Sequence, residues 1–211
     1  MISILLGIIK TLVLLGILVI IHEGGHFIVA KLCKIRVNEF SIGFGKILWS
    51  KQGKETKYSI RLIPLGGFVN LEGEEEQSDM EGSFSKANIW KKIAIISAGA
   101  IVNIIFGFIV YFILVTCHYG IQEAFSSTGK FATALANSIK VLFTGGTKID
   151  DLAGPVGITA IVSKTSNISD FIYLLSVISL SLGITNLIPI PPLDRWKDFV
   201  IYNRGNKEKA F

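Results

Sequence analysis

The chain has 211 residues, of which 50% are hydrophobic, and its mean hydropathy is positive. This composition is typical of a membrane protein and argues against an ordinary soluble domain. The formal net charge of +5 is modest, and acidic residues lie among the basic ones without a recognition motif. Nucleic-acid binding is therefore not indicated.

Three apolar stretches are each long enough to cross a bilayer as a helix, for which about 20 residues suffice. They cover approximately residues 1–30, 93–117 and 171–190. The first has no basic start and no small-residue cleavage site after it, which argues against a cleaved signal peptide. We therefore expect a mainly α-helical, polytopic membrane protein with three transmembrane helices.

Basic residues predict the topology. Eleven Lys and Arg residues lie between the first and second spans, but only four lie between the second and third. By the positive-inside rule the first loop is cytoplasmic, which places the N-terminus outside the plasma membrane. Cys33 and Cys117 then fall at opposite ends of this topology, so a disulfide framework is not expected.

The two loops carry different patterns. Residues 35–71 combine β-prone runs with glycines, and the QGKE segment within them is typical of a hairpin turn. We predict a small β-hairpin or sheet here, after the first helix. In the second loop, residues 130–143 (KFATALANSIKVLF) predict an interfacial helix.

The segment HEGGH, at residues 22–26, carries the candidate chemistry. Because His22 and His26 are four residues apart, their rings lie on one face of a helix and can reach one Zn²⁺ ion. Glu23 is then placed to act as general base toward a water molecule on the metal. The H-E-x-x-H pattern also occurs by chance in soluble helices, but ionisable residues within a membrane span are costly and usually functional.

A zinc site needs a third protein ligand, and the sequence offers few. His118 is predicted at the opposite end of its span from the histidine pair. Cys33 lies two helical turns beyond His26, which makes it difficult to reach a metal on the same helix. Asp194 remains, at the inner end of the third span, where three prolines break the helix.

Four motifs together resemble the site-2 protease family of intramembrane zinc metalloproteases. They are HEGGH, the glycine-rich SIGFG and PLGGFV segments, LAGPVGI, and N-x-x-P-x-P-x-L-D from Asn186 to Asp194. They occur in the family's order, and the resemblance covers residues 1–194, which we expect to form an intramembrane metalloprotease core.

The resemblance implies a function and a set of site residues. The function is regulated intramembrane proteolysis, in which transmembrane segments of membrane proteins such as anti-sigma factors or signal-peptide remnants are cleaved. It implies that His22, His26 and Asp194 hold the zinc and that Glu23 is the base. It also implies that Asn103 faces the active site.

Further residues follow from the same resemblance. The glycine-rich hairpin, with Gly66 and Gly67, is expected against the membrane lipid near the site, where an extended substrate could pair with its edge. Asn186 and Pro189, in the last motif, are expected to line the active site.

The chain departs from the family in two respects. No PDZ domain fits between the second and third spans, and the family's L-D-G-G with a following fourth span is replaced by LDRWKDFVIYNRGNKEKAF. A one-base deletion after the Asp194 codon, with suitable synonymous codons, would restore D-G-G and an apolar run. We therefore hypothesise that residues 195–211 are out of frame and that the fourth transmembrane helix is missing.

There are two alternatives to a protease, and the missing fourth span bears on the first of them. The first is a catalytically inactive, truncated family member that acts by binding, because Asp194 would lack the packing that holds it in place. The second is a transporter or channel that uses the histidines, which is disfavoured because such folds usually show internal symmetry and none is visible.

Overall fold

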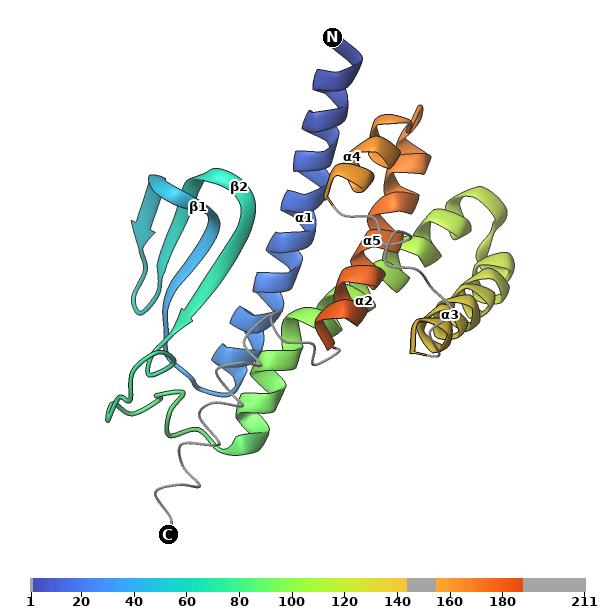
Figure 1. Cartoon of the computed structure of the whole chain (residues 1–211). Coiled ribbons are helices and arrows are strands. Elements are labelled where there is room, and N and C mark those ends of the chain that lie inside the picture. Colours follow the sequence, from blue (N-terminus) through green and yellow to red (C-terminus); the bar gives the residue numbers. More distant parts are fainter. Residues whose placement is uncertain (1, 144–154, 188–211) are drawn as a thin grey trace. The chain divides into compact units, whose positions relative to one another are not determined.

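The computed structural model describes residues 2–143 and 155–187 (Figure 1). Its elements are, in chain order, α1 (Ile2–Leu32), β1 (Val37–Gln52), β2 (Lys57–Leu71), α2 (Ile89–Tyr119), α3 (Ile121–Phe143), α4 (Pro155–Ser163) and α5 (Ile168–Leu187). Pro189, Asp194 and the tail at 195–211 lie outside the described residues, so the predictions made for them stay predictions.

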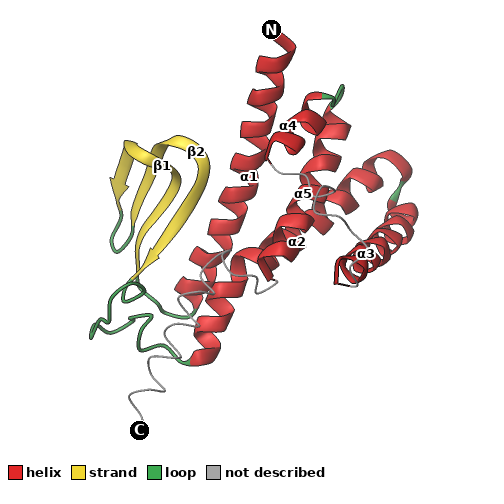
Figure 2. Cartoon of the chain, in the orientation of Figure 1, coloured by secondary structure: helices red, strands yellow, loops and turns green. Residues whose placement is uncertain are grey.

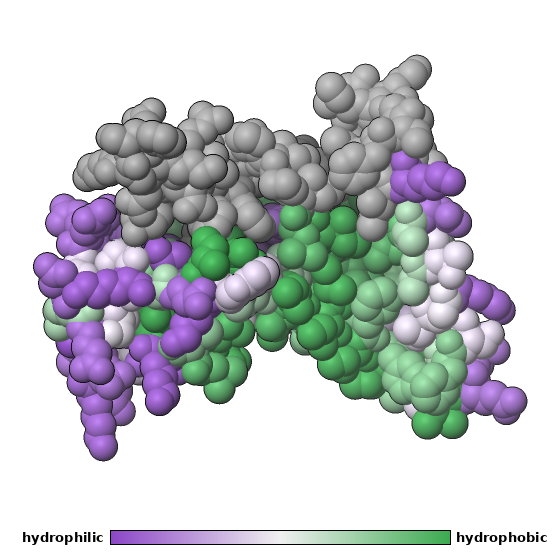
Figure 3. Space-filling model, turned by 90° about the horizontal axis from the view of Figure 1, so that it is seen from below, coloured by the Kyte–Doolittle hydropathy of each residue, from purple (hydrophilic) through white to green (hydrophobic). Residues whose placement is uncertain are grey.

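The prediction of a mainly helical chain with three span-length helices and a small sheet is confirmed (Figure 2). Helix α1 from Leu5, helix α2 and helix α5 are each long and apolar enough to cross a membrane. Large apolar side chains are exposed on each of these helices, among them Leu5, Ile109 and Tyr173, and hydrophobic residues are seen at the surface in Figure 3. Such a surface suits contact with lipid.

Helix α2 begins at Ile89, earlier than the apolar run at 93 suggests. The reason is a cap. The side-chain oxygen of Asn88 accepts a hydrogen bond from the backbone N–H of Trp90 at 3.1 Å. The backbone carbonyl oxygen of Asn88 accepts hydrogen bonds from the N–H groups of Lys91 and Lys92. The cap therefore extends the helix through the basic residues that precede the span.

The chain divides into two compact units, which are described separately. One comprises residues 1–15 and 105–180, and the other comprises residues 16–104 and 181–211. The candidate metal ligands that the structure describes lie in the second unit.

The sheet of the second unit is built from two long, bent strands. β1 pairs antiparallel with β2, and the turn between them follows Gln52, in the predicted QGKE segment. Phe40 pairs with both Tyr58 and Val69, so the first half of β1 lies between two segments of β2. Gly43 bends β1 with a φ of 87°, in the left-handed region where glycine is favoured.

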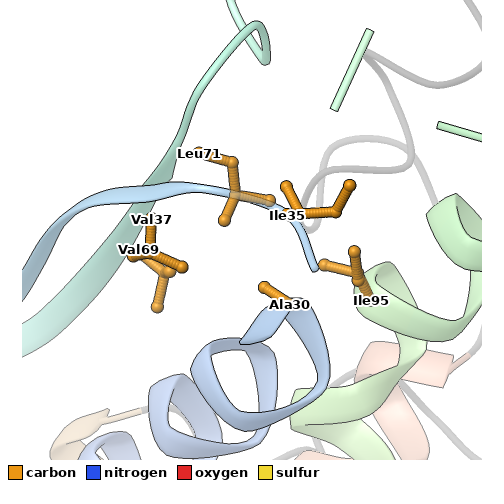
Figure 4. Close-up of a cluster of buried hydrophobic side chains, with 6 residues drawn as sticks. All are labelled: Ala30, Ile35, Val37, Val69, Leu71 and Ile95. Atoms are coloured by element: carbon orange, nitrogen blue, oxygen red, sulfur yellow. The ribbon is translucent and has the colours of Figure 1, made fainter. Parts of the chain in front are cut away.

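A buried hydrophobic cluster attaches this sheet to the helices (Figure 4). It consists of Ala30, Ile35, Val37, Val69, Leu71 and Ile95, all 4% exposed or less. Val69 and Leu71 are two residues apart in β2, so they point to the same face of the strand, toward the end of α1. Each fully buried aliphatic side chain contributes about 1.5–3 kcal/mol. The cluster thereby fixes the base of the sheet beside the helix that carries HEGGH.

In the first unit, aromatic side chains pack α3 against α2. Tyr111 stacks on Phe131 with ring centroids 4.4 Å apart, and Phe112 meets the edge of Phe125 at 5.0 Å. Gly120, with a φ of 85°, makes the sharp turn between the two helices. The helix predicted at 130–143 is therefore longer and begins at Ile121. Its predicted interfacial location stays a prediction.

Candidate metal centre

Two buried imidazoles converge on α1. His22 is 7% exposed and His26 is 2% exposed, and their rings meet edge to face with centroids 4.9 Å apart. Their Nε2 atoms are 3.2 Å apart. Two nitrogens on one tetrahedral zinc ion, at about 2.0–2.1 Å each, would be about 3.3 Å apart. The spacing of the two nitrogens therefore fits a shared metal ion.

The hydrogen bond of His26 favours the tautomer that a metal needs. Its Nδ1 lies 2.7 Å from the carbonyl oxygen of Ile95, which can only accept, so Nδ1 carries the proton. In the neutral ring Nε2 then carries the lone pair. A backbone carbonyl on α2 thus orients the first imidazole.

The imidazole of His22 is oriented by a side chain of α2. The amide group of Asn103, which is fully buried, lies 3.2 Å from Nδ1 of His22. In this contact the amide nitrogen of Asn103 faces the ring. The nitrogen and the oxygen of an amide group have nearly the same shape, so the group can also be placed with its oxygen toward the ring. With the amide oxygen turned toward the ring, Nδ1–H of His22 donates to Asn103 and Nε2 presents its lone pair to a metal.

Gly99 places no side chain of its own beside the two nitrogens. A Cβ atom at this position would lie 2.5 Å from Nε2 of His26 and 2.8 Å from Nε2 of His22. Sequence reasoning missed this residue. The signal that could have revealed it is its position four residues before Asn103, on the same face of α2.

Close approach of the two helices depends on a second glycine. A Cβ atom at Gly25 would lie 2.8 Å from the carbonyl oxygen of Ala98 and 3.0 Å from the Cα atom of Gly99. Small residues at such a crossing let two backbones come together within a membrane. The glycines of α1 and α2 therefore bring the imidazoles of one helix to the backbone of the other.

The edge of the sheet lies against Glu23. A Cβ atom at Gly67 would lie 3.0 Å from Cγ of Glu23 and 2.7 Å from the carbonyl oxygen of Ser41. Gly66 has a φ of 138°. A Cβ atom at this position would overlap the ring of Phe44. The structure thus brings Gly67 to Glu23, which adjoins His22 in the sequence, and Gly66 precedes Gly67 in the same strand.

The remaining predicted residues lie at or beyond the end of α5. Gly183 packs against α2, where its Cβ would lie 2.7 Å from the carbonyl oxygen of Ala100. Asn186 follows three residues later and is half-buried, which places it on the same side of α5. Asp194 and Pro189 follow beyond the described residues.

Within residues 2–143 and 155–187, no group of three His, Cys, Asp or Glu side chains is placed to hold a metal ion. Cys33 packs against the hydrophobic cluster. His118 lies in the other unit, with Nδ1 2.9 Å from the carbonyl oxygen of Leu114 and Nε2 3.2 Å from the hydroxyl of Ser169. The predicted choice of Asp194 as third ligand therefore stays a prediction.

A charged network stabilises the sheet next to the site. Arg61 donates to Glu39 at 2.8 Å and to the hydroxyl of Ser41 at 2.9 Å, and its guanidinium lies 5.0 Å from the ring centroid of Phe68. Phe68 follows Gly67 in the strand beside Glu23. Arg61 thus connects the centre of the sheet to the strand at the candidate site.

The same network shifts the pKa of Glu39. Burial by itself would raise this pKa, but hydrogen bonds from Ser59 and Arg61, together with the charges of Lys57 and Arg61, outweigh burial and lower it. A carboxyl whose pKa is lower when folded stabilises the protein above its unfolded pKa. That stabilisation is lost as the pH falls through the folded pKa.

Replacing Glu39 with glutamine is expected to lower the melting temperature at pH 7 by about 2–8 °C. Loss of charge-assisted hydrogen bonds costs about 1–2 kcal/mol, and 1 kcal/mol corresponds to about 2–4 °C in a chain of this size. Thermal unfolding in detergent at pH 7 and pH 3 checks this, because the difference from the unmodified chain should shrink at the lower pH. Glu55→Gln is the control, since its exposed pair with Lys31 contributes little. An equal difference at both pH values would contradict the prediction.

Two histidines and a carboxylate in the pattern H-E-x-x-H are typical of zinc peptidases. Here the pattern lies on a helix that is long and apolar enough to cross a membrane, and both histidines are buried. The sequence model of peptidase family M50 matches residues 10–194, and the chain belongs to this family, that of the site-2 proteases.

Several relatives bear out this assignment. One relative is a Vibrio cholerae protein whose name describes it as a zinc metalloprotease. It is 44% identical to this chain over 119 residues, which are 54% of this chain and 26% of the relative. The regulator of sigma-E protease RseP of Escherichia coli is 40% identical over 119 residues, with the same two shares of 54% and 26%. Protease RseP of Yersinia pestis is 42% identical over 119 residues, again 54% and 26%. The chain thus spans about a quarter of the length of these relatives.

Proposed function

We propose that the chain acts as an intramembrane zinc metalloendopeptidase that cleaves transmembrane segments of membrane proteins. The observation that carries this proposal is the convergence of two buried imidazole nitrogens, 3.2 Å apart, on a span-length helix. Membership of family M50 and relatives named for zinc metalloproteases support zinc as the metal. In this proposal His22, His26 and Asp194 are the ligands.

The residues of the chain divide the chemistry among them. When bound, zinc supplies a Lewis acid that lowers the pKa of water to about 7. Glu23 takes the proton of the attacking water and returns it to the departing amine, so that water and a peptide bond become a carboxylate and an amine. Asn103 orients the imidazole of His22 and the Ile95 carbonyl orients that of His26, each through the ring nitrogen that does not face the metal.

The sheet edge offers a way to present the substrate. A transmembrane helix hides its peptide bonds within its own hydrogen bonds, so it must open before hydrolysis. The β2 segment beginning at Gly67 pairs with β1 on one side and lies next to Glu23. An unwound substrate segment would add to this edge as a strand, which places its carbonyl groups beside the base.

The substrate class and orientation follow from the family and the charges. Relatives are named as regulators of sigma-E, which supports a membrane-anchored anti-sigma factor as substrate; a signal-peptide remnant is of the same chemical kind. The basic residues around the sheet support a cytoplasmic location for it, with the N-terminus outside and the active site near the cytoplasmic face.

The proposal is tested by reconstituting the chain in proteoliposomes with a model single-span substrate. We expect stoichiometric zinc by elemental analysis and cleavage within the span that stops on chelation and returns with added zinc. Zinc binding without cleavage would favour the alternative of an inactive family member that acts by binding. Absence of zinc would overturn the proposal.

Replacing Asn103 with leucine is expected to weaken zinc binding about 10–100-fold, the usual effect of losing a group that orients a ligand. Leucine has similar volume but cannot hydrogen-bond to His22. Competition with a chromogenic chelator measures the affinity. Asn137→Leu, at an exposed position of α3, is the matched control. An unchanged affinity in Asn103→Leu would show that the amide does not orient the imidazole.

A further inference from the structure

Lys10 is an ionisable residue within the first apolar stretch. Between Met1 and Ile21 it is the sole charged side chain. Its ammonium donates to the carbonyl oxygen of Thr165 at 2.8 Å and lies 3.4 Å from the hydroxyl of the same residue. Charges at such positions are costly and mark functional sites by default.

A pocket opens beside this ammonium, within the first unit. It has a volume of about 340 Å³, at the lower end of the range of about 300–1,000 Å³ for ligand sites. It is lined by three residues of α1 and five residues of the α4–α5 turn and the start of α5: Ile9, Lys10, Val13, Thr165, Ser166, Asn167, Ile168 and Phe171. Most of the lining surface is apolar, although half of the lining residues are polar, and Lys10 is the one charged residue among them.

No carboxylate in the described part of the chain neutralises Lys10. Both of its contacts are to neutral oxygens of Thr165, although an ammonium has three donors. The acidic residue nearest to the turn is Asp170. It lies 3.4 Å from the Ser166 hydroxyl and lines a different pocket, together with His118. The first pocket therefore combines an uncompensated positive charge with apolar walls.

We propose that this pocket binds an anionic phospholipid, with its phosphate at Lys10 and its glycerol and upper acyl carbons against Ile9, Val13 and Phe171. A phosphate pairs with an ammonium as a charge-assisted hydrogen bond. Apolar walls match the part of the lipid that follows the phosphate. A zwitterionic headgroup would bring its own cation next to Lys10, so phosphatidylglycerol is preferred to phosphatidylcholine.

The bound lipid would hold two parts of the unit together. Lys10 belongs to α1, whereas Thr165 and Phe171 come from the turn before α5 and from α5 itself. A ligand that contacts both stabilises the folded arrangement by mass action, because the unfolded chain does not form the pocket. The lipid is thus a stabilising ligand of this unit, separate from the metal centre.

The test is native mass spectrometry of the full chain in detergent, together with its melting temperature after addition of phosphatidylglycerol or phosphatidylcholine. We expect phosphatidylglycerol to remain bound and to raise the melting temperature, with Lys10→Met weakening its retention at least tenfold. Lys164→Met, which removes an exposed charge of the same turn outside the pocket, should behave as the unmodified chain. Lys10→Arg should retain the lipid.

A second variant keeps the test decisive if Lys10→Met does not fold. Val13→Trp adds bulk at a position 50% exposed and leaves Lys10 in place. It should lose the lipid because the ring occupies the pocket. Equal retention of phosphatidylglycerol in Lys10→Met or Val13→Trp would overturn the proposal. So would an equal effect of phosphatidylcholine, or an equal rise in melting temperature with inorganic phosphate alone.

Discussion

Replacing Glu23 with glutamine is expected to slow cleavage of a transmembrane substrate by about 10²–10⁴-fold, the usual contribution of a general base. Glutamine has the same shape but cannot accept the proton of the attacking water. The histidines are unchanged, so zinc content should stay the same. The comparison of cleavage rate with zinc content, in one reconstituted preparation, separates loss of the base from loss of the site.

Glu55→Gln is the matched control for this experiment. Glu55 is an exposed carboxylate paired with Lys31 and lies in the hairpin turn, so its replacement should leave the cleavage rate unchanged. A Glu23→Gln variant that cleaves at the original rate would exclude Glu23 as the base. A variant that loses zinc as well would assign Glu23 a role in holding the metal.

Replacing Gly99 with alanine is expected to reduce zinc affinity by more than about 100-fold. This loss exceeds the usual effect of removing a group that hydrogen-bonds to a metal ligand. The added methyl carbon would lie 2.5 Å from Nε2 of His26 and 2.8 Å from Nε2 of His22. It therefore competes with a metal ion for the same space. His22 and His26 are both buried, so their rings have little room to move away from the added methyl group.

Gly24→Ala is the control for the second prediction. Gly24 lies between the two histidines in sequence, yet a Cβ there meets no described atom within 4 Å. This variant should keep its zinc. Circular dichroism of both variants separates a blocked site from an unfolded helix, because α2 should keep its helicity in Gly99→Ala. Stoichiometric, tightly bound zinc in folded Gly99→Ala would show that the metal does not occupy this space.

The two experiments together distinguish a catalyst from a binding protein. Loss of cleavage with zinc retained in Glu23→Gln, and loss of both in Gly99→Ala, is the pattern of a metallopeptidase. If neither variant changes any measured cleavage, the histidine pair serves another purpose. The lipid proposal is independent of this outcome because it concerns the pocket at Lys10.

Local periodicity made part of this structure predictable from the sequence. The three long helices follow from apolar runs long enough to cross the hydrocarbon core of a bilayer. The small sheet follows from alternating β-prone segments and glycine turns. The face shared by His22 and His26 follows from the four-residue spacing. Each of these properties is determined within a single segment, so no knowledge of neighbouring segments was needed.

Tertiary packing alone decided which groups surround the histidines. The approach of α1 to α2 at Gly25 and Gly99 brings the Ile95 carbonyl to His26, and the bent sheet brings Gly67 to Glu23. These contacts join residues far apart in the chain, and they depend on side-chain volumes at a helix crossing rather than on any repeat. The sequence by itself therefore determined the spans and the HEGGH face. The packed helices and sheet decided the space beside the two imidazole nitrogens and the strand edge at Glu23.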